Sequence, residues 1–150
     1  MARPLKKGLD YFPIDCIDSD SIELLIAKHG LEGYGILVQL WKRIYQVEGY
    51  YTDWTEKNLL IFCGKFGINV ETARQVVETC LSEALFHRKI FTDHSRLTSA
   101  SIQSRYVRIC TDSKRKDIHI DPKIDLISAK LPGFAPEETG VNTGGNAAGA

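Results

Sequence analysis

The sequence predicts a mainly α-helical domain with a small β-hairpin, and three observations support this fold class. Apolar residues recur at helical spacing through most of residues 19–116. Glycines and helix-capping residues separate these periodic segments and mark where helices end and begin. Short stretches rich in aromatic and β-branched residues interrupt the helical pattern, as strands do. The chain has 150 residues, of which 43% are hydrophobic, so it can form one domain with a core.

Four regions are predicted along the chain. The N-terminal region contains prolines and a glycine and should be extended, and the C-terminal region has almost nothing to bury. Because the composition at Ala150 is that of a linker, we expect the natural protein to continue beyond it. The predicted regions are an extended arm (1–18), a folded domain (19–116), a partly ordered extension (117–131) and a disordered tail (132–150).

Five helices are predicted from apolar periodicity, capping residues and glycine stops. D-x-x-E patterns that begin at Asp20 and Asp53 are typical of helix starts. The second helix is expected at the centre of the fold, because it is apolar except for one narrow polar stripe. That stripe consists of Gln39, Lys42, Arg43 and Gln46. The predicted helices span about residues 21–30, 32–47, 54–65, 70–83 and 99–113.

Short strands are predicted between the helices. Residues 50–52 follow the central helix, and residues 85–87 are expected to pair with 97–98 as a hairpin around a basic turn. We call this predicted hairpin, residues 85–98, the wing. Residues 117–121 alternate like a further strand. The resulting order of elements is that of a winged helix-turn-helix with an extra N-terminal helix and a C-terminal helix.

The formal net charge of zero conceals an uneven distribution of charge. Residues 85–116 hold eight Lys and Arg and two Asp residues, a net +6, whereas residues 117–150 hold two Lys and five acidic residues, a net −3. In winged-helix DNA binders the helix at 70–83 would enter the major groove and the wing would reach the flanking backbone. That helix exposes three carboxylates and one arginine, which opposes phosphate binding. The wing and the last helix are therefore the better candidate surface.

The candidate DNA-binding residues combine this basic surface with two side chains of the helix at 70–83 that have base-reading chemistry. The set is Arg74, Gln75, Arg88, Lys89, Arg96, Arg105, Arg108, Lys114 and Arg115. The hypothesis requires the basic residues after position 85 to gather into one patch on the wing and the last helix. A solvated charged face is the alternative that stays open.

The apolar residues of the arm and the aromatic residues of the first strand form a second candidate surface. The arm is too apolar to be left in water, so it should dock either on its own domain or on a neighbouring subunit. Docking on a neighbour predicts self-association, most simply as a dimer. The candidate oligomerisation residues are Leu9, Tyr11, Phe12, Ile14, Tyr50 and Tyr51.

Neither catalytic nor metal-binding chemistry is predicted. The cysteines have no C-x-x-C spacing and are interpreted as small buried hydrophobic residues. They are Cys16, Cys63, Cys80 and Cys110. The glycine-rich stretches at 30–35 and 64–67 lack the strand and spacing of nucleotide-binding loops. No apolar run approaches the roughly 18–20 residues of a membrane span, and no signal peptide is evident, so we expect a cytoplasmic, non-enzymatic protein without a cofactor.

Five sequence blocks within residues 3–116 carry a family resemblance. They are KGLDYFP (7–13), GYGILVQLWKRIY (33–45), GYY (49–51), LTS (97–99) and QSRY (103–106). They resemble the N-terminal domain of a family of bacterial phage and prophage proteins that is similar to the DnaD-type replication proteins. The resemblance implies a winged-helix domain of a replication-initiation or primosome-like protein, followed by a linker and a second DNA-binding region. It implies self-assembly as much as DNA binding.

Two hypotheses for function follow. In the first, the chain is a DNA-associated module of a phage or prophage replication-initiation protein, and the wing and last helix bind the DNA backbone weakly and without sequence specificity. In the second, the chain is an oligomerisation or protein-docking domain of such a protein, with replication proteins as partners and no DNA contact of its own. The two hypotheses are compatible with each other.

Overall fold

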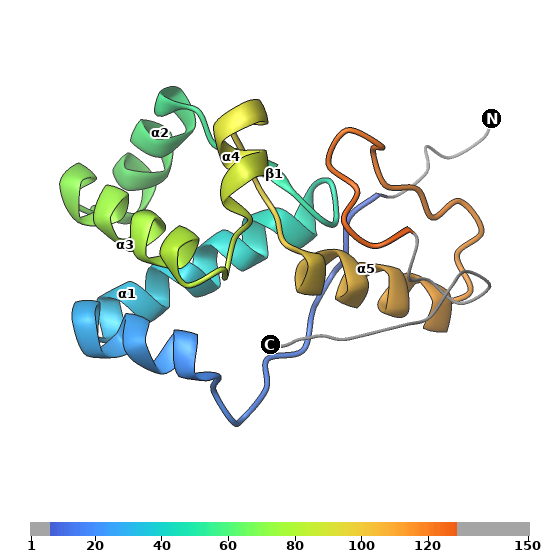
Figure 1. Ribbon diagram of the computed structural model, residues 1–150, viewed down its shortest axis with the longest axis horizontal. Coiled ribbons are helices and arrows are strands. Elements are labelled where there is room, and N and C mark those ends of the chain that lie inside the picture. The colour runs from blue at the N-terminus through green and yellow to red at the C-terminus, as the bar shows by residue number, and fades with distance from the viewer. Residues whose placement is uncertain (1–6, 129–150) are drawn as a thin grey trace.

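The computed structural model describes residues 7–128 of the chain. Five helices and one antiparallel pair of short strands make up the regular structure of this range (Figure 1). This confirms the predicted mainly helical fold with a small sheet. The elements are α1 (Asp20–Gln46), β1 (Thr52–Asp53), α2 (Glu56–Phe66), α3 (Val70–Ser82), α4 (Arg88–His94), β2 (Arg96–Leu97) and α5 (Ala100–Asp112).

α1 combines the first two predicted helices in one element that is broken at Gly30. Gly30 has φ 69° and ψ −165°, a conformation that residues with a side chain rarely adopt, so the helix kinks there. The part before the kink is tied to α3 by a 2.8 Å hydrogen bond between the His29 ring and the Thr79 hydroxyl. The part after the kink is the predicted central helix. Its buried residues are Gly33, Ile36, Leu37, Leu40, Trp41, Ile44 and Tyr45.

Capping residues start the helices, although two predicted caps are displaced by one or two positions. Ser19 rather than Asp20 caps α1, and its hydroxyl accepts a hydrogen bond from a first-turn amide. Thr55 rather than Asp53 caps α2, in a reciprocal capping box with Asn58. In both helices a hydroxyl takes the cap position because it reaches the first-turn amide directly. α3 and α5 begin and end within one residue of their predicted bounds.

The predicted wing is wrong, because its turn is a helix and its two strands do not form a ladder. α4 occupies the position of the turn, and β2 pairs with β1 instead, with Thr52 opposite Leu97. Within the described residues, one backbone hydrogen bond joins the two expected wing strands, from the His87 amide to the Thr98 carbonyl at 2.8 Å. The small sheet therefore connects α1 to α5 and does not project from the molecule as a hairpin.

Local interactions explain why α4 forms where a turn was expected. The His87 ring accepts a hydrogen bond from the Ile90 amide at 3.4 Å and caps the helix. Ile90 is buried, which anchors the helix to the core. Lys89 and Asp93 form an ion pair at the helical i, i+4 spacing. Ser95 ends the helix in a left-handed conformation with φ 54°.

The extension after α5 docks on the domain without forming the strand predicted at residues 117–121. Ile120, Ile124 and Ile127 are buried in the same hydrophobic cluster as the helices. The apolar alternation at 117–121 therefore reflects side chains that dock in the core, and its backbone has no strand partner within residues 7–128. The predicted tail at residues 132–150 lies outside the described residues.

Replacing Gln103 with Leu is expected to loosen the docking of this extension. The Gln103 side chain is fully buried in α5, donates to the Ile124 carbonyl at 2.9 Å and accepts from the Leu126 amide at 2.8 Å. Leaving a buried polar group without its partner costs about 1–3 kcal/mol. We expect Gln103→Leu to lower the free energy of unfolding by about 2–4 kcal/mol in urea titrations. An equal loss in Gln75→Leu, an exposed control in α3, would contradict this role.

The cap of α4 is expected to make stability depend on pH. Burial, with Lys89 nearby, lowers the pKa of His87 below its ordinary value of 6.5, so the folded chain favours the neutral ring. This contribution to stability is present above pH 6.5 and is lost as the pH falls below it. His87→Asn keeps an acceptor that does not titrate, so it should flatten the fall in the free energy of unfolding between about pH 7.5 and pH 5. His94→Asn, at the end of α4, is the control, and identical profiles for wild type and His87→Asn would refute the prediction.

Candidate functional site

The face of α3 that the sequence assigned to DNA is occupied by polar pairs. The Arg74 guanidinium donates to both carboxylate oxygens of Glu56 in α2, with Nη1 and Oε1 2.8 Å apart. The Gln75 amide donates to Glu71 at 3.4 Å. The hydrogen bonds from Arg74 lower the pKa of Glu56, so both partners remain charged at neutral pH. Both candidate base-reading side chains thus have carboxylate partners.

The basic residues of α4 are paired in the same way. Arg88 Nη1 donates to Oε1 of Glu78 in α3 at 3.1 Å, and this contact lowers the pKa of the Glu78 carboxyl. Lys89 Nζ lies 3.0 Å from Asp93 Oδ2. Both of these α4 cations therefore have a carboxylate partner, Glu78 of α3 for Arg88 and Asp93 of α4 for Lys89.

Arg96 of β2 is held between two acidic side chains and an aromatic ring. Its guanidinium lies 3.5 Å from Asp53 and 3.1 Å from Asp121, and it stacks 4.4 Å from the ring centroid of Tyr51. The side chain is 24% exposed. Arg96 therefore joins β1, β2 and the extension, and it is engaged within the domain.

Two more candidate arginines are also bound inside the domain. Arg105 lies 3.6 Å from Asp15 of the arm and beside the hydroxyl of Tyr45, whose pKa burial raises to about 12. Arg115 donates to the backbone carbonyls of Lys7 at 3.2 Å and Gly8 at 2.9 Å. Both side chains fasten the arm to α5 and the turn that follows it.

The remaining basic candidates lie in the second half of α5 and just beyond it. Arg108, Lys114 and the neighbouring Lys116 are exposed. No carboxylate pairs with any of the three in the described part of the chain. The wing hairpin is absent from residues 85–98, and Arg88, Lys89 and Arg96 are paired with carboxylates, so the prediction of one basic patch on a wing and the last helix is wrong. The patch reduces to the end of α5.

The candidate oligomerisation residues divide into buried and exposed members. Leu9 and Tyr50 are each 7% exposed, and the Phe12 ring stacks on Tyr45 with centroids 4.6 Å apart. The arm therefore docks on its own domain, which was one of the two possibilities that the sequence left open. Only Tyr11 (78% exposed) and Ile14 (45%) among the predicted residues present large exposed apolar surfaces.

Close backbone approach fixes the start of the arm against α1 and α5. The Leu9 amide donates to the Tyr45 carbonyl at 2.7 Å, and the Tyr106 hydroxyl donates to the Lys7 carbonyl at 2.9 Å. A Cβ atom on Gly8 would lie 1.7 Å from the carbonyl oxygen of Gln46, so no larger residue fits there. The glycine of the KGLDYFP block is thus required by packing.

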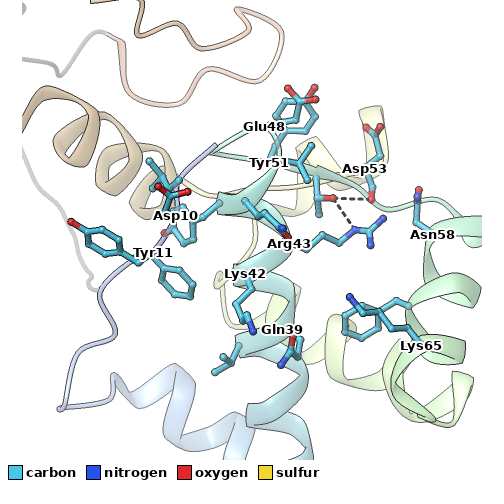
Figure 2. Close-up of a pocket in the computed structure, with 18 of the residues that line it drawn as sticks. Asp10, Tyr11, Gln39, Lys42, Arg43, Glu48, Tyr51, Asp53, Asn58 and Lys65 are labelled. Atoms are coloured by element: carbon cyan, nitrogen blue, oxygen red, sulfur yellow. Dashed lines mark hydrogen bonds between the residues drawn. The ribbon is translucent and has the colours of Figure 1, made fainter. Parts of the chain in front are cut away.

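The docked arm forms one wall of a groove (Figure 2). The second half of α1 is the floor, α2 is the opposite wall, and β1 closes one end. The groove encloses about 860 Å³, within the range of about 300–1,000 Å³ typical of ligand sites. Its floor carries the polar stripe seen in the sequence, Gln39, Lys42, Arg43 and Gln46.

The cations of the groove, unlike the basic residues of α4 and β2, lack ion pairs within residues 7–128. Lys42 and Lys65 are exposed, and Lys65 Nζ lies 5.1 Å from the ring centroid of Phe66. Arg43 Nε donates to the Thr52 hydroxyl at 3.1 Å. Across the range that the structure describes, no carboxylate pairs with any of these three cations.

The carboxylates that line the groove lie nearer the arm and β1, and two of them have cationic partners elsewhere. Lys7 lies 3.6 Å from Glu48 and Arg96 lies 3.5 Å from Asp53. The third is Asp10 of the arm. Glu48 and Asp53 are therefore partly neutralised by Lys7 and Arg96. They offset less of the positive charge of Lys42, Arg43 and Lys65 than two unpaired carboxylates would.

Sequence comparison assigns residues 11–102 to a family described as Lin1244/Lin1753-like, N-terminal. The chain belongs to this family. It is 38% identical over 109 residues to the uncharacterized phage-related protein Lin1244/Lin1753 of Listeria innocua serovar 6a, an overlap of 71% of this chain and 35% of the relative. The chain therefore spans about a third of the length of that relative. No solved structure matches the chain.

The Lin1244/Lin1753-like segment contains α1 to β2 and most of the groove, and it ends before the basic end of α5. The predicted association with phage proteins is confirmed. The similarity to DnaD-type replication proteins stays a prediction. The groove is the feature that sequence reasoning missed in this Lin1244/Lin1753-like chain. The polar stripe of the otherwise apolar central helix marks the floor of the groove, but from the sequence it predicts only that this helix lies at the centre of the fold.

Residues 7–128 contain neither a candidate metal cluster nor a helix that could cross a membrane. No group of three or more His, Cys, Asp or Glu side chains between residues 7 and 128 is arranged to hold a metal ion. In the same range, every helix is too short or too polar to cross a membrane. Cys63, Cys80 and Cys110 are buried as predicted, but Cys16 is exposed on the arm, which corrects the prediction for that residue.

Gly8→Ala is expected to release the arm and open the groove. The new methyl group would overlap the carbonyl of Gln46, and forced overpacking costs about 1–3 kcal/mol. We expect faster proteolytic cleavage within the arm and a lower free energy of unfolding. Gly35→Ala is the control, because a Cβ atom there meets nothing within 4 Å. Wild-type resistance of the arm to proteolysis in Gly8→Ala would disprove this requirement.

Proposed function

We propose that this domain is a DNA-associated, winged-helix-like module of a phage replication-type protein that contacts the DNA backbone through the end of α5. One observation carries the proposal: Arg108, Lys114 and Lys116 are exposed and have no carboxylate partner in residues 7–128. Exposed cations without ion pairs are the residues that can exchange counterions for phosphates.

The fold supports this proposal in part. α2 and α3 form a helix-turn-helix whose turn holds Gly67 in a left-handed conformation with φ 65°. The order of α1, β1, α2, α3 and β2, with β1 beside β2, is compatible with a winged helix in which α4 replaces the wing hairpin. We infer no major-groove contact by α3, because its exposed arginine is paired with carboxylates.

Charge sets the expected strength of binding. Three cations neutralise few phosphates, and the affinity should fall with the logarithm of salt concentration with a slope of about −0.9 per phosphate contacted. Arg115 holds the arm by hydrogen bonds to backbone carbonyls, so it positions this surface more than it binds phosphate. We therefore propose weak duplex binding without sequence preference.

Self-association or docking to a replication protein is the second candidate function. Tyr11 and Ile14 project from the docked arm, and Ile17 beside them is 87% exposed. Clustered exposed apolar side chains on one segment are typical of protein interfaces. In this proposal the arm stays docked on its own domain and presents its outer side chains to the partner.

Reversing charge at the end of α5 should abolish duplex binding. We expect wild-type protein to bind a fluorescein-labelled DNA duplex at low salt with a dissociation constant of about 1–100 µM. Arg108→Glu with Lys116→Glu should weaken this at least about tenfold in anisotropy titrations, because two phosphate contacts become repulsive. Lys28→Glu with Lys89→Glu is the control for net charge. Absence of wild-type binding at low salt, or equal losses in both double variants, would reject the proposal.

A further inference from the structure

We propose that the groove between the arm, α1 and α2 binds a short stretch of single-stranded nucleic acid. This site is separate from the duplex surface at the end of α5, and it does not depend on that surface. The argument combines three features of the lining residues: cations without ion pairs, exposed aromatic rings, and uncharged amides between them.

The cations supply the sites for the sugar–phosphate backbone. Lys42 and Arg43 stand on the floor and Lys65 stands on the α2 wall, and none of them is paired with a carboxylate in the described structure. Arg43 keeps its guanidinium NH₂ groups available, because its contact with Thr52 uses Nε. Every other arginine discussed above except Arg108 is held by carboxylates or backbone carbonyls. Uncompensated positive charge along a groove is what a polyanion requires.

Aromatic rings stand at the two edges of the groove. Phe66 lies next to Lys65 on α2, and the Tyr11 ring projects from the arm on the side that faces away from α1 (Figure 2). Tyr11 is 78% exposed and Phe66, next to Lys65, is 38% exposed. A ring exposed to this degree gains from stacking on a base, and such stacking contributes about 1–3 kcal/mol per base.

Amide side chains complete the lining. Gln39 and Gln46 on the floor belong to the same polar stripe as the two floor cations. An amide both donates and accepts hydrogen bonds, so it can meet the edge of any unpaired base or a sugar hydroxyl. This combination favours a ligand that presents phosphates, flat faces and polar edges together.

The same features distinguish a single strand from other polyanions. A duplex keeps its base faces inside the stack, so it cannot use Tyr11 or Phe66 as platforms. An acidic protein segment would satisfy the cations, yet it offers no flat faces for the exposed rings. The groove cations stand on α1 and α2, so the phosphates should lie over these two helices.

The test uses a fluorescein-labelled oligothymidylate of about 12 nucleotides, because site sizes for such grooves are about 4–16 nucleotides and base identity matters little. We expect wild-type protein to bind it at low salt in anisotropy titrations. Lys42→Glu with Lys65→Glu should weaken binding at least about tenfold. The matched control is Lys42→Glu with Lys57→Glu, because Lys57 is exposed on α2 but does not line the groove. The affinity of this control for the oligothymidylate should fall markedly less.

The aromatic contribution is tested separately. Tyr11→Ala should weaken binding about fivefold or more, and Tyr11→Phe, which keeps the ring, should bind as wild type does. A fluorescein-labelled oligoglutamate of equal charge is the probe for acidic protein segments. If it binds as tightly as the oligothymidylate, or if Tyr11→Ala has no effect, the nucleic-acid assignment is overturned. Thermal unfolding of each variant checks that the domain remains folded.

Failure of this proposal and failure of the duplex proposal give different results. If oligothymidylate binding is lost in Arg108→Glu with Lys116→Glu and retained in Lys42→Glu with Lys65→Glu, the groove is not the site and the α5 surface stands. If duplex binding is absent while the groove variants abolish oligothymidylate binding, the groove stands and the α5 proposal falls. No binding of oligothymidylate by wild-type protein at low salt overturns the groove proposal alone.

Discussion

The docking of residues 7–9 is the constraint on which much of the structure depends. Four hydrogen bonds hold this backbone: one to the Tyr45 carbonyl of α1, one from the Tyr106 hydroxyl and two from the Arg115 guanidinium. Because the contacts come from α1 and from both α5 and the turn after it, they join the two ends of the folded domain. They also place the rest of the arm beside α1, which creates the groove. Without them Leu9 and Phe12 would lose their places in the core.

The paired arginines have a common role in this fold. Arg74 links α3 to α2, Arg88 links α4 to α3, and Arg96 links β2 to β1 and the extension. Exposed pairs of this kind add little stability individually, but they neutralise the charges of the basic segment. A net charge counted along the sequence therefore overestimates the positive surface, because it does not show which carboxylates the fold brings to each cation.

The sequence was most informative where local rules decide the structure. Capping residues, glycine stops and apolar periodicity predicted α3 and α5 to within one residue of their bounds, because these signals act over a few residues. The wing failed because a histidine cap and one buried isoleucine outweigh the turn-like composition of residues 88–96. The groove was not predictable, because it depends on the path of the arm. That path is set by hydrogen bonds between the backbone of residues 7–9 and groups about 36 to 108 positions away in the sequence.

The distribution of thiols on this fold has a practical chemical consequence. Burial raises the pKa of Cys80 to about 12, so its reactive thiolate form is scarce at neutral pH, and Cys63 and Cys110 are shielded by the core. Cys16 stands in solvent on the arm, two residues beyond Ile14 of the groove wall. A maleimide dye should therefore label the unmodified chain at Cys16 first. With Trp41 and Trp54 buried in the core as energy donors, such a dye would report whether the arm is docked without any engineered substitution.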